Sequence, residues 1–336
     1  MRAQITVWLL AGLASCGSTG GSGGGGGTPG PATADTGGGS DHGASPPAPP
    51  PGPPVPAEGA TVRIYVAGES IERRNRFVEA PFTSSGALNE RGGGELRNDT
   101  DEYGWSVPLG DRLALRYPGL TVEFVGAETW LDADDSPYSG SWPAGGPGHT
   151  SAISGTDIPS WLEQRRVELE QKTHCYDVAF AARGGNDFGN DNDEDYQTRL
   201  KELVVLLASG SSCRSDPLIV VTAHVPDDQR DGSGDDAAYV ATQKHRFVDR
   251  VKAVVDALHT ERSSLHVQFL DMYTPFLDNR PTTAFPSETW STGGIPDFAK
   301  IVRVGDSLHI RRLASIYIGE IAADALDLGA LGIVTP

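Results

Sequence analysis

The chain has 336 residues, with 27 Lys plus Arg against 45 Asp plus Glu, so its formal net charge is −18 and its pI is about 4.7. This acidic balance argues against a nucleic-acid partner, which would require a basic face. Three cysteines exclude a disulfide-dense scaffold and a four-cysteine zinc site, and they leave room for one disulfide and one further thiol.

The N-terminus predicts export. An apolar stretch from Ile5 to Ala14 follows the initial Met-Arg pair, and it ends in the quartet Leu-Ala-Ser-Cys at 13–16. This quartet resembles the lipobox of bacterial lipoproteins, which implies a signal peptide over residues 1–15 and a lipid on Cys16. The alternative is an ordinary secretory signal. By the same resemblance, Gly17 favours a bacterial outer membrane or cell surface, with the lipid as the only membrane contact.

The next segment, residues 16–60, is predicted to be a disordered tether that begins with the lipidated cysteine. It contains no aromatic residue after Cys16, a Gly-rich half at 20–27 and a Pro-rich half at 46–56. Such a composition cannot bury enough apolar surface to fold. We therefore expect one folded domain over residues 61–330.

From Thr61 onward, short β-branched runs alternate with helical stretches, which predicts a parallel sheet with helices on both faces. The candidate strands are Val62–Ala67, Leu120–Val125, Asp177–Ala182, Leu218–Thr222 and Leu265–Leu270. Apolar residues at helical spacing predict a helix from about Asp236 to His259, with a core stripe of Val240, Phe247, Val251, Val254 and Leu258. A last helix is predicted to bury one apolar face made of Ile310, Leu313, Tyr317, Ile321, Ala325 and Leu328. The fold class is thus α/β, a three-layer α/β/α sandwich with a five-stranded parallel sheet.

Three segments without periodicity are predicted to be long surface loops, at 81–102, 129–150 and 281–300. Loops of this length usually carry function or disorder. They contain Trp130, Trp142 and Trp290, whose indole rings we expect to offer stacking faces for sugar rings.

Polar motifs follow four of the five predicted strands. In doubly wound sheets the active site lies at the carboxyl ends of the strands. The motifs are Gly68-Glu69-Ser70, Ser154-Gly155-Thr156-Asp157, Gly184-Gly185-Asn186-Asp187 and Asp306-Ser307-Leu308-His309. A serine, a histidine and an aspartate from separate strand exits can converge as nucleophile, base and orienting carboxylate.

These four motifs, in this order, resemble the blocks of the SGNH (GDSL) hydrolases. The resemblance implies a flavodoxin-like fold and a carboxylic ester hydrolase. It also implies a role for each residue: Ser70 as nucleophile, His309 as base and Asp306 as its partner. The oxyanion donors would be Ser70, Gly155 and Asn186.

Two positions leave questions open. Glu69 stands where the family usually has Asp, and we expect this change to affect local packing more than chemistry. The glycine of the second block has competitors in Gly145, Gly146 and Gly148, and Gly155 is preferred because Ser-Gly-x-x-Ile resembles the stretch found in acetylxylan-esterase-like members of the family.

Two other polar patterns are given structural interpretations. Asp256-Ala257-Leu258-His259 repeats the Asp-x-x-His spacing, but it lies inside a predicted helix and is interpreted as a solvated face. The acidic run from Asn190 to Asp195 has oxygen ligands of the kind Ca²⁺ prefers, yet its spacing fits no defined loop, so a solvated helix N-terminus is favoured and Ca²⁺ binding is left open. We expect no metal site and no cofactor.

A disulfide between Cys175 and Cys213 is predicted. Both residues lie just before a predicted strand, the third and the fourth, and export would place them in an oxidising compartment.

The leading hypothesis is a monomeric, lipid-anchored serine esterase that removes small acyl groups, above all acetyl, from an extracellular polysaccharide. The net charge of −18 disfavours polyanions, so neutral acetylated glycans such as xylan or mannan are the preferred partners. The alternatives are a lipase or thioesterase for longer acyl chains, and a non-catalytic glycan-binding protein on the same fold. The sugar and the acyl position are left open.

Overall fold

The computed structural model describes residues 55–56, 59–73, 75, 77, 80–89, 103–131, 148–187, 192–228, 236–302 and 308–335. Cys16, Trp142 and Asp306 lie outside these ranges. The described residues belong to one compact unit. None of their helices is long and apolar enough to cross a bilayer.

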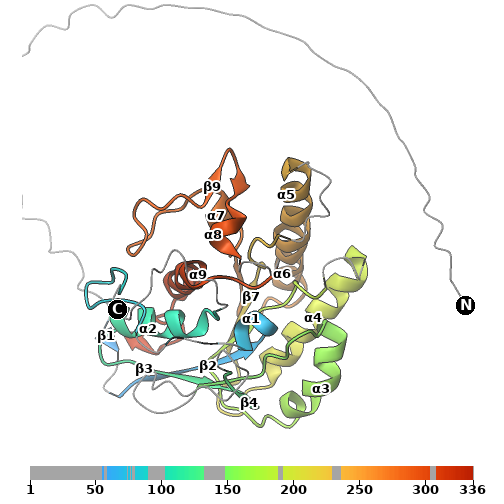
Figure 1. Cartoon of the computed structure of the whole chain (residues 1–336). Coiled ribbons are helices and arrows are strands. Elements are labelled where there is room, and N and C mark those ends of the chain that lie inside the picture. The colour runs from blue at the N-terminus through green and yellow to red at the C-terminus, as the bar shows by residue number, and fades with distance from the viewer. Residues whose placement is uncertain are drawn as a thin grey trace, which may run out of the picture. The chain divides into compact units, whose positions relative to one another are not determined.

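A parallel five-stranded sheet forms the centre of this unit (Figure 1). Its strands, in spatial order, are β3 (Thr121–Val125), β2 (Thr61–Ala67), β6 (Val178–Ala181), β7 (Leu218–Thr222) and β8 (Val267–Leu270). All pairings between neighbours are parallel. The five predicted strands are confirmed, each to within two residues. The chain moves outward from β2 to β3 and then crosses back to β6, so the switch point of the sheet lies between β2 and β6.

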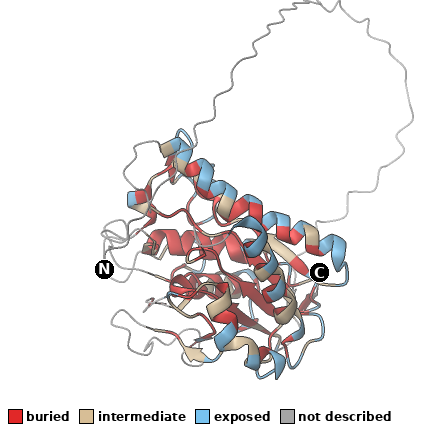
Figure 2. Cartoon of the chain, turned by 90° about the vertical axis from the view of Figure 1, so that its right-hand side faces the viewer, coloured by how far each residue is buried: buried red, intermediate tan, exposed pale blue. Residues whose placement is uncertain are grey.

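Alternation along the strands sends their side chains to two separate cores. Val62, Ile64 and Val66 of β2 pack in the core beneath α2 (Ser106–Arg116) and α9 (Arg312–Ala325). Tyr65 and Ala67 point to the opposite core. That second core lies beneath three helices, namely α3 (Ile158–Glu170), α4 (Asp193–Ser209) and α6 (Arg250–Glu261). The result is the predicted three-layer sandwich, with its exposed residues on the outer faces of the helices (Figure 2).

The helix predicted from about Asp236 to His259 is present but not uniform. It consists of α5 (Asp236–Lys244), a π turn at His245–Asp249 and α6. All five predicted core residues of this helix are buried.

The last helix differs from its prediction. It begins at Arg312, and every residue from Arg312 to Ala323 is buried, so it does not bury only one face. The reason is that α9 also packs closely against α2 and is covered by side chains of the segment between β8 and α9, including Phe276, Phe285 and Trp290. Ile310 precedes this helix in a bridge to Val302, and Leu328 follows it.

Short elements change the predicted boundaries. β1 (Val55–Pro56) pairs with β11 (Val334–Thr335), so the folded unit extends beyond residues 61–330 at both ends. β4 (Glu128–Thr129) pairs with β5 (His149–Thr150). The segment predicted as a loop at 281–300 contains the hairpin of β9 (Ser291–Thr292) and β10 (Ile295–Pro296), and it leads into α8 (Phe298–Ile301). It follows α7 (Thr274–Leu277), and the remaining short helix, α1, is Ser70–Arg73.

The expectation that tryptophans in these loops stack on sugars is wrong for two of them. Trp130 is 0% exposed and Trp290 is 1% exposed. Trp130 packs on Phe124, and Trp290 packs among Phe276, Phe285 and Tyr317. Their large apolar rings stabilise the fold beneath the loops, where no ligand can reach them.

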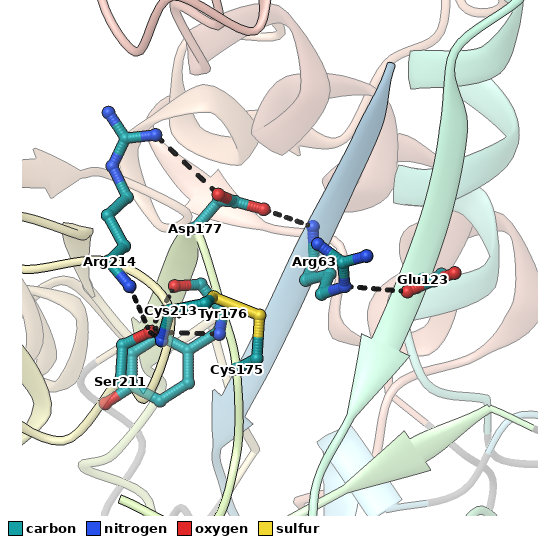
Figure 3. Close-up of a disulfide and its surroundings, with 8 residues drawn as sticks. All are labelled: Arg63, Glu123, Cys175, Tyr176, Asp177, Ser211, Cys213 and Arg214. Atoms are coloured by element: carbon teal, nitrogen blue, oxygen red, sulfur yellow. Dashed lines mark hydrogen bonds and ion pairs between the residues drawn. A yellow bond between two sulfur atoms is a disulfide. The ribbon is translucent and has the colours of Figure 1, made fainter. Parts of the chain in front are cut away.

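Cys175 and Cys213 form the expected disulfide, with their Cα atoms 5.0 Å apart (Figure 3). It lies at the amino ends of β6 and β7, away from the edge where the polar motifs emerge. The Ser211 hydroxyl donates to the Tyr176 carbonyl at 2.8 Å and accepts from the Tyr176 N–H group at 3.1 Å. The disulfide therefore closes a connection that hydrogen bonds already hold together.

Replacing both cysteines by serine should lower the free energy of unfolding by about 4 kcal/mol, because the open chain regains the entropy of a loop spanning 38 residues. Urea unfolding of the oxidised protein and of the double variant measures the difference. Equal stability of the two proteins would contradict the expectation.

Candidate active site

Ser70 begins α1, directly after β2. The chain leaves β2 at Ala67 and turns through Gly68 and Glu69, and Ser70 is 7% exposed. The turn requires glycine at position 68, because a Cβ atom there would lie 2.5 Å from the Cβ of Glu72. The short helix thereby folds back against the end of the strand and presents Ser70 at the switch point of the sheet.

His309 lies against Ser70 although 239 residues separate the two in the sequence. Its Nε2 atom is 2.6 Å from Ser70 Oγ, within hydrogen-bond distance. The segment around His309 is held by the bridge between Val302 and Ile310 and by the bond from Arg311 N–H to the Ile301 carbonyl, 2.8 Å long. His309 precedes α9, which begins at Arg312.

Asn186 lies in the turn that follows β6 and contacts Glu69, the residue before Ser70. Its side-chain Nδ2 donates to Glu69 Oε2 at 2.8 Å, and its backbone N–H group donates to the same oxygen at 3.0 Å. Gly184 N–H donates to the other oxygen, Oε1, at 2.8 Å. Glu69, the position at which the sequence departs from the family pattern, thus bonds directly to a predicted oxyanion donor.

The loop that contains Gly155 is hydrogen-bonded to the turn after β2 and to the turn after β6. Ile153 N–H donates to the Gly68 carbonyl at 3.1 Å, and Ile158 N–H donates to Asp187 Oδ1 at 2.9 Å. Gly155 itself is exposed, with φ of +71° and open space where a Cβ would stand. The positive φ favours glycine.

Of the competing glycines, Gly148 is required for packing, since a Cβ there would lie 2.5 Å from the Trp130 ring. Gly145 and Gly146 lie outside the described residues.

Arg183 is a buried cation that joins the same three segments. Its side chain is fully buried, with Nε 3.9 Å from Glu69 Oε1. Nη1 donates to the Gly68 carbonyl at 2.7 Å, and Nη2 donates to the Thr156 carbonyl. Buried charges are tolerated when they are paired and hydrogen-bonded. Sequence reasoning missed this residue, although a lone arginine between an apolar strand and a glycine pair was a visible signal.

Glu72 is a second buried carboxyl group at this turn. It accepts from Glu69 N–H at 2.7 Å and from the Trp105 indole N–H at 3.0 Å. Burial raises the pKa of Glu72, and the negative charge of Glu69 raises it further. Glu72 therefore supports the turn by accepting hydrogen bonds.

The two other polar patterns of the sequence make structural contacts. The Asp256 to His259 motif lies in α6, where Asp256 pairs with Lys252 at 2.6 Å and His259 Nε2 lies 2.8 Å from the Val267 carbonyl. In the acidic run, Asn192 caps α4 through a bond from Asp195 N–H. Among the residues that the structure describes, no group of three or more His, Cys, Asp or Glu is placed to hold a metal ion.

Asp187 is fully buried, and burial raises its pKa to about 6. The negative charge of Glu69 also raises this pKa, whereas the hydrogen bond from Ile158 N–H lowers it. In the unfolded chain the pKa of an aspartate is about 3.9. Between these two values the folded state binds more protons than the unfolded state, so the Asp187 contribution to stability falls as pH increases.

Asp187→Asn should therefore gain thermal stability relative to the wild type as the pH is raised from 4 to 7.5, as measured by Tm across that range. Asp157→Asn is the matched control with the opposite sign. Burial alone would raise the pKa of Asp157, but the hydrogen bonds from Ser160 outweigh this effect, and the pKa is lowered overall. This variant should lose relative stability as pH rises. A pH-independent Tm difference for Asp187→Asn would refute the assignment.

No family model matches the chain, and no curated protein matches it. Solved structures with a similar fold include a family 3 carbohydrate esterase from Clostridium thermocellum, with 17% identity and a TM-score of 0.45 over 81% of this chain and 98% of that one. An acetylxylan esterase from Geobacillus stearothermophilus has 18% identity and a TM-score of 0.41 over 82% and 94%. A carbohydrate acetylesterase from Sinorhizobium meliloti has 16% identity and a TM-score of 0.36 over 80% and 99%. At such identities and TM-scores we base no functional inference on these similarities.

Proposed function

We propose that the protein is a serine esterase of the SGNH type that hydrolyses small acyl esters through an acyl-enzyme on Ser70. The observation that carries the proposal is the distance of 2.6 Å between His309 Nε2 and Ser70 Oγ. Two polar residues from distant parts of the chain meet at the switch point of a doubly wound sheet, where such folds bind their ligands. A hydroxyl group paired with an imidazole is the arrangement of an activated nucleophile.

In the first half of the reaction, His309 Nε2 accepts the proton of Ser70 as Oγ attacks the ester carbonyl carbon. The carbonyl oxygen becomes an oxyanion, which the N–H groups of Ser70 and Gly155 and the Asn186 amide stabilise. His309 then gives the proton to the leaving alcohol, and the acyl group stays on Ser70. By the family resemblance, Asp306 orients the imidazole and stabilises its charged form.

In the second half, water enters and His309 accepts one of its protons. The resulting hydroxide attacks the acyl carbon, and the tetrahedral intermediate expels Ser70, which recovers its proton from His309. The products are the free acid and the regenerated enzyme.

The substrate is proposed to be an acetyl ester on a neutral extracellular polysaccharide, with the enzyme held at the cell envelope by a lipid on Cys16. This part rests on the export signal, the polar tether and the acidic charge of the sequence. The buried positions of Trp130 and Trp290 remove the argument from sugar stacking. A lipase or thioesterase acting on longer chains is the competing possibility.

Ser70→Ala should abolish hydrolysis of p-nitrophenyl acetate, because Ser70 Oγ is the atom that carries the acyl group in the proposed mechanism. Asn186→Ala should lower kcat about 10²- to 10³-fold, the usual cost of losing one oxyanion donor. Steady-state kinetics on folded variants, with matched circular dichroism spectra, tests both. Normal turnover by Ser70→Ala would eliminate the proposed mechanism. An absence of turnover in the wild type would instead favour the non-catalytic binding protein.

Acyl-chain preference separates the two substrate classes. We expect kcat/KM to fall from p-nitrophenyl acetate to the octanoate and palmitate esters, and we expect release of acetate from acetylated xylan or manno-oligosaccharides. A kcat/KM that increases past about eight carbons, in the absence of acetate release, would favour the lipase or thioesterase. Larger acyl chains bury more apolar surface, so a site built for them gains about 0.8 kcal/mol per methylene.

A further inference from the structure

We infer that Glu69 is a positioning residue that fixes the side-chain amide of Asn186 for oxyanion binding. The inference rests on the proposed function and adds to it a residue that lies outside the nucleophile, the base and the oxyanion donors. It starts from the two bonds that Asn186 makes to one oxygen of Glu69, from Nδ2 at 2.8 Å and from the backbone N–H group at 3.0 Å.

The chemistry of a carboxylate determines which way the amide faces. An ionised carboxylate accepts hydrogen bonds and donates none, so it selects the nitrogen of the Asn186 amide over the oxygen. All three partners of Glu69 in the third block are N–H groups, namely Gly184 N, Asn186 N and Asn186 Nδ2. Because Nδ2 carries two hydrogens, it can donate to Glu69 and to a substrate oxyanion at once. With the amide turned over, its oxygen would face the oxyanion and repel it.

The packing around Gly185 places the carboxylate against this turn. A Cβ atom on Gly185 would lie 2.9 Å from Glu69 Oε2 and 2.6 Å from His224 Nε2. The turn can therefore approach the carboxylate only because residue 185 is glycine. On the far side of it, His224 is held by a contact of 2.8 Å between Nδ1 and the Val225 carbonyl, and its ring packs against Phe247.

Arg183 balances the charge that this arrangement buries. A negative carboxylate close to the oxyanion would by itself oppose the charge that develops in the transition state. The guanidinium Nε lies 3.9 Å from Glu69 Oε1, and the same side chain bonds to the carbonyls of Gly68 and Thr156. The positive charge thus lies within the same buried cluster, and Glu69 can hold the amide at a smaller electrostatic cost.

Glu69→Gln tests the inference, because a carboxamide has only one accepting oxygen and cannot satisfy three N–H donors. Glu320→Gln is the matched control. Glu320 is also a fully buried carboxylate, it accepts from the N–H groups of Thr283 and Ala284, and Arg112 lies 3.2 Å from it. It shares the chemistry of Glu69 but supports the segment above α9, apart from Ser70.

The first measurement is independent of turnover. In protein labelled with ¹⁵N-asparagine, the side-chain amide signal of Asn186 is identified by its absence in Asn186→Ala. We expect its proton shifts and its protection from solvent exchange to change in Glu69→Gln and to stay the same in Glu320→Gln. An Asn186 signal that is identical in the wild type and in Glu69→Gln would overturn the inference, whatever the protein hydrolyses.

The second measurement is a double-mutant cycle on kcat. Glu69→Gln should lower kcat about 10- to 100-fold with little change in KM, the size of effect that a displaced catalytic group produces. Added to Asn186→Ala, it should have almost no further effect, because Glu69 acts through the amide that is already missing.

If the losses from Glu69→Gln and Asn186→Ala multiply in the double variant, Glu69 acts by another route and the inference is wrong. The wild type could hydrolyse esters through Ser70 while Glu69→Gln is equally active. That result would likewise reject the inference and leave the proposed function intact. If the wild type shows no Ser70-dependent hydrolysis, the proposed function is rejected instead. The Asn186 amide signal would still show whether Glu69 fixes that side chain.

Discussion

The register between the parallel strands β2 and β6 ends at the pair Ala67 and Ala181. Beyond that pair, the segments that follow the two strands form separate turns. The carboxylate of Glu69 connects them past this point, through its bonds from the N–H groups of Gly184 and Asn186. Backbone N–H groups in such turns need acceptors, and a buried carboxylate supplies several at one position. Together with the bond from Arg183 to the Gly68 carbonyl, it fixes the turn carrying Asn186 against the turn carrying Ser70.

The same cluster holds the third turn in place. Arg183 donates to carbonyl groups of Gly68 and Thr156, and Ile158 N–H donates to Asp187. Three segments that are far apart in the sequence are thus joined by charged or backbone groups that are buried together. Catalytic groups work best when their supporting contacts leave them little freedom, and this cluster provides that support from beneath the site.

The sequence was sufficient for the sheet because its strands are short β-branched runs separated by helical stretches, a pattern set by local periodicity. It also pointed to Ser70 and His309, through the resemblance of their motifs to the SGNH blocks, and the structure brings His309 Nε2 within 2.6 Å of Ser70 Oγ. It failed where burial depends on packing between distant segments. Trp290 was expected on a loop surface, yet Phe276, Phe285 and Tyr317 enclose it. The contact between Glu69 and Asn186 joins residues 117 apart in the sequence and has no local signature.

In the proposed mechanism, His309 activates Ser70 as a nucleophile. Reaction with a serine-directed fluorophosphonate, followed by peptide mapping of the modified site, is the experiment that probes this activation. We expect a single modified residue, Ser70, and a modification rate in His309→Ala that is lower by orders of magnitude. Modification at a different serine, or equal rates in the wild type and in His309→Ala, would contradict it.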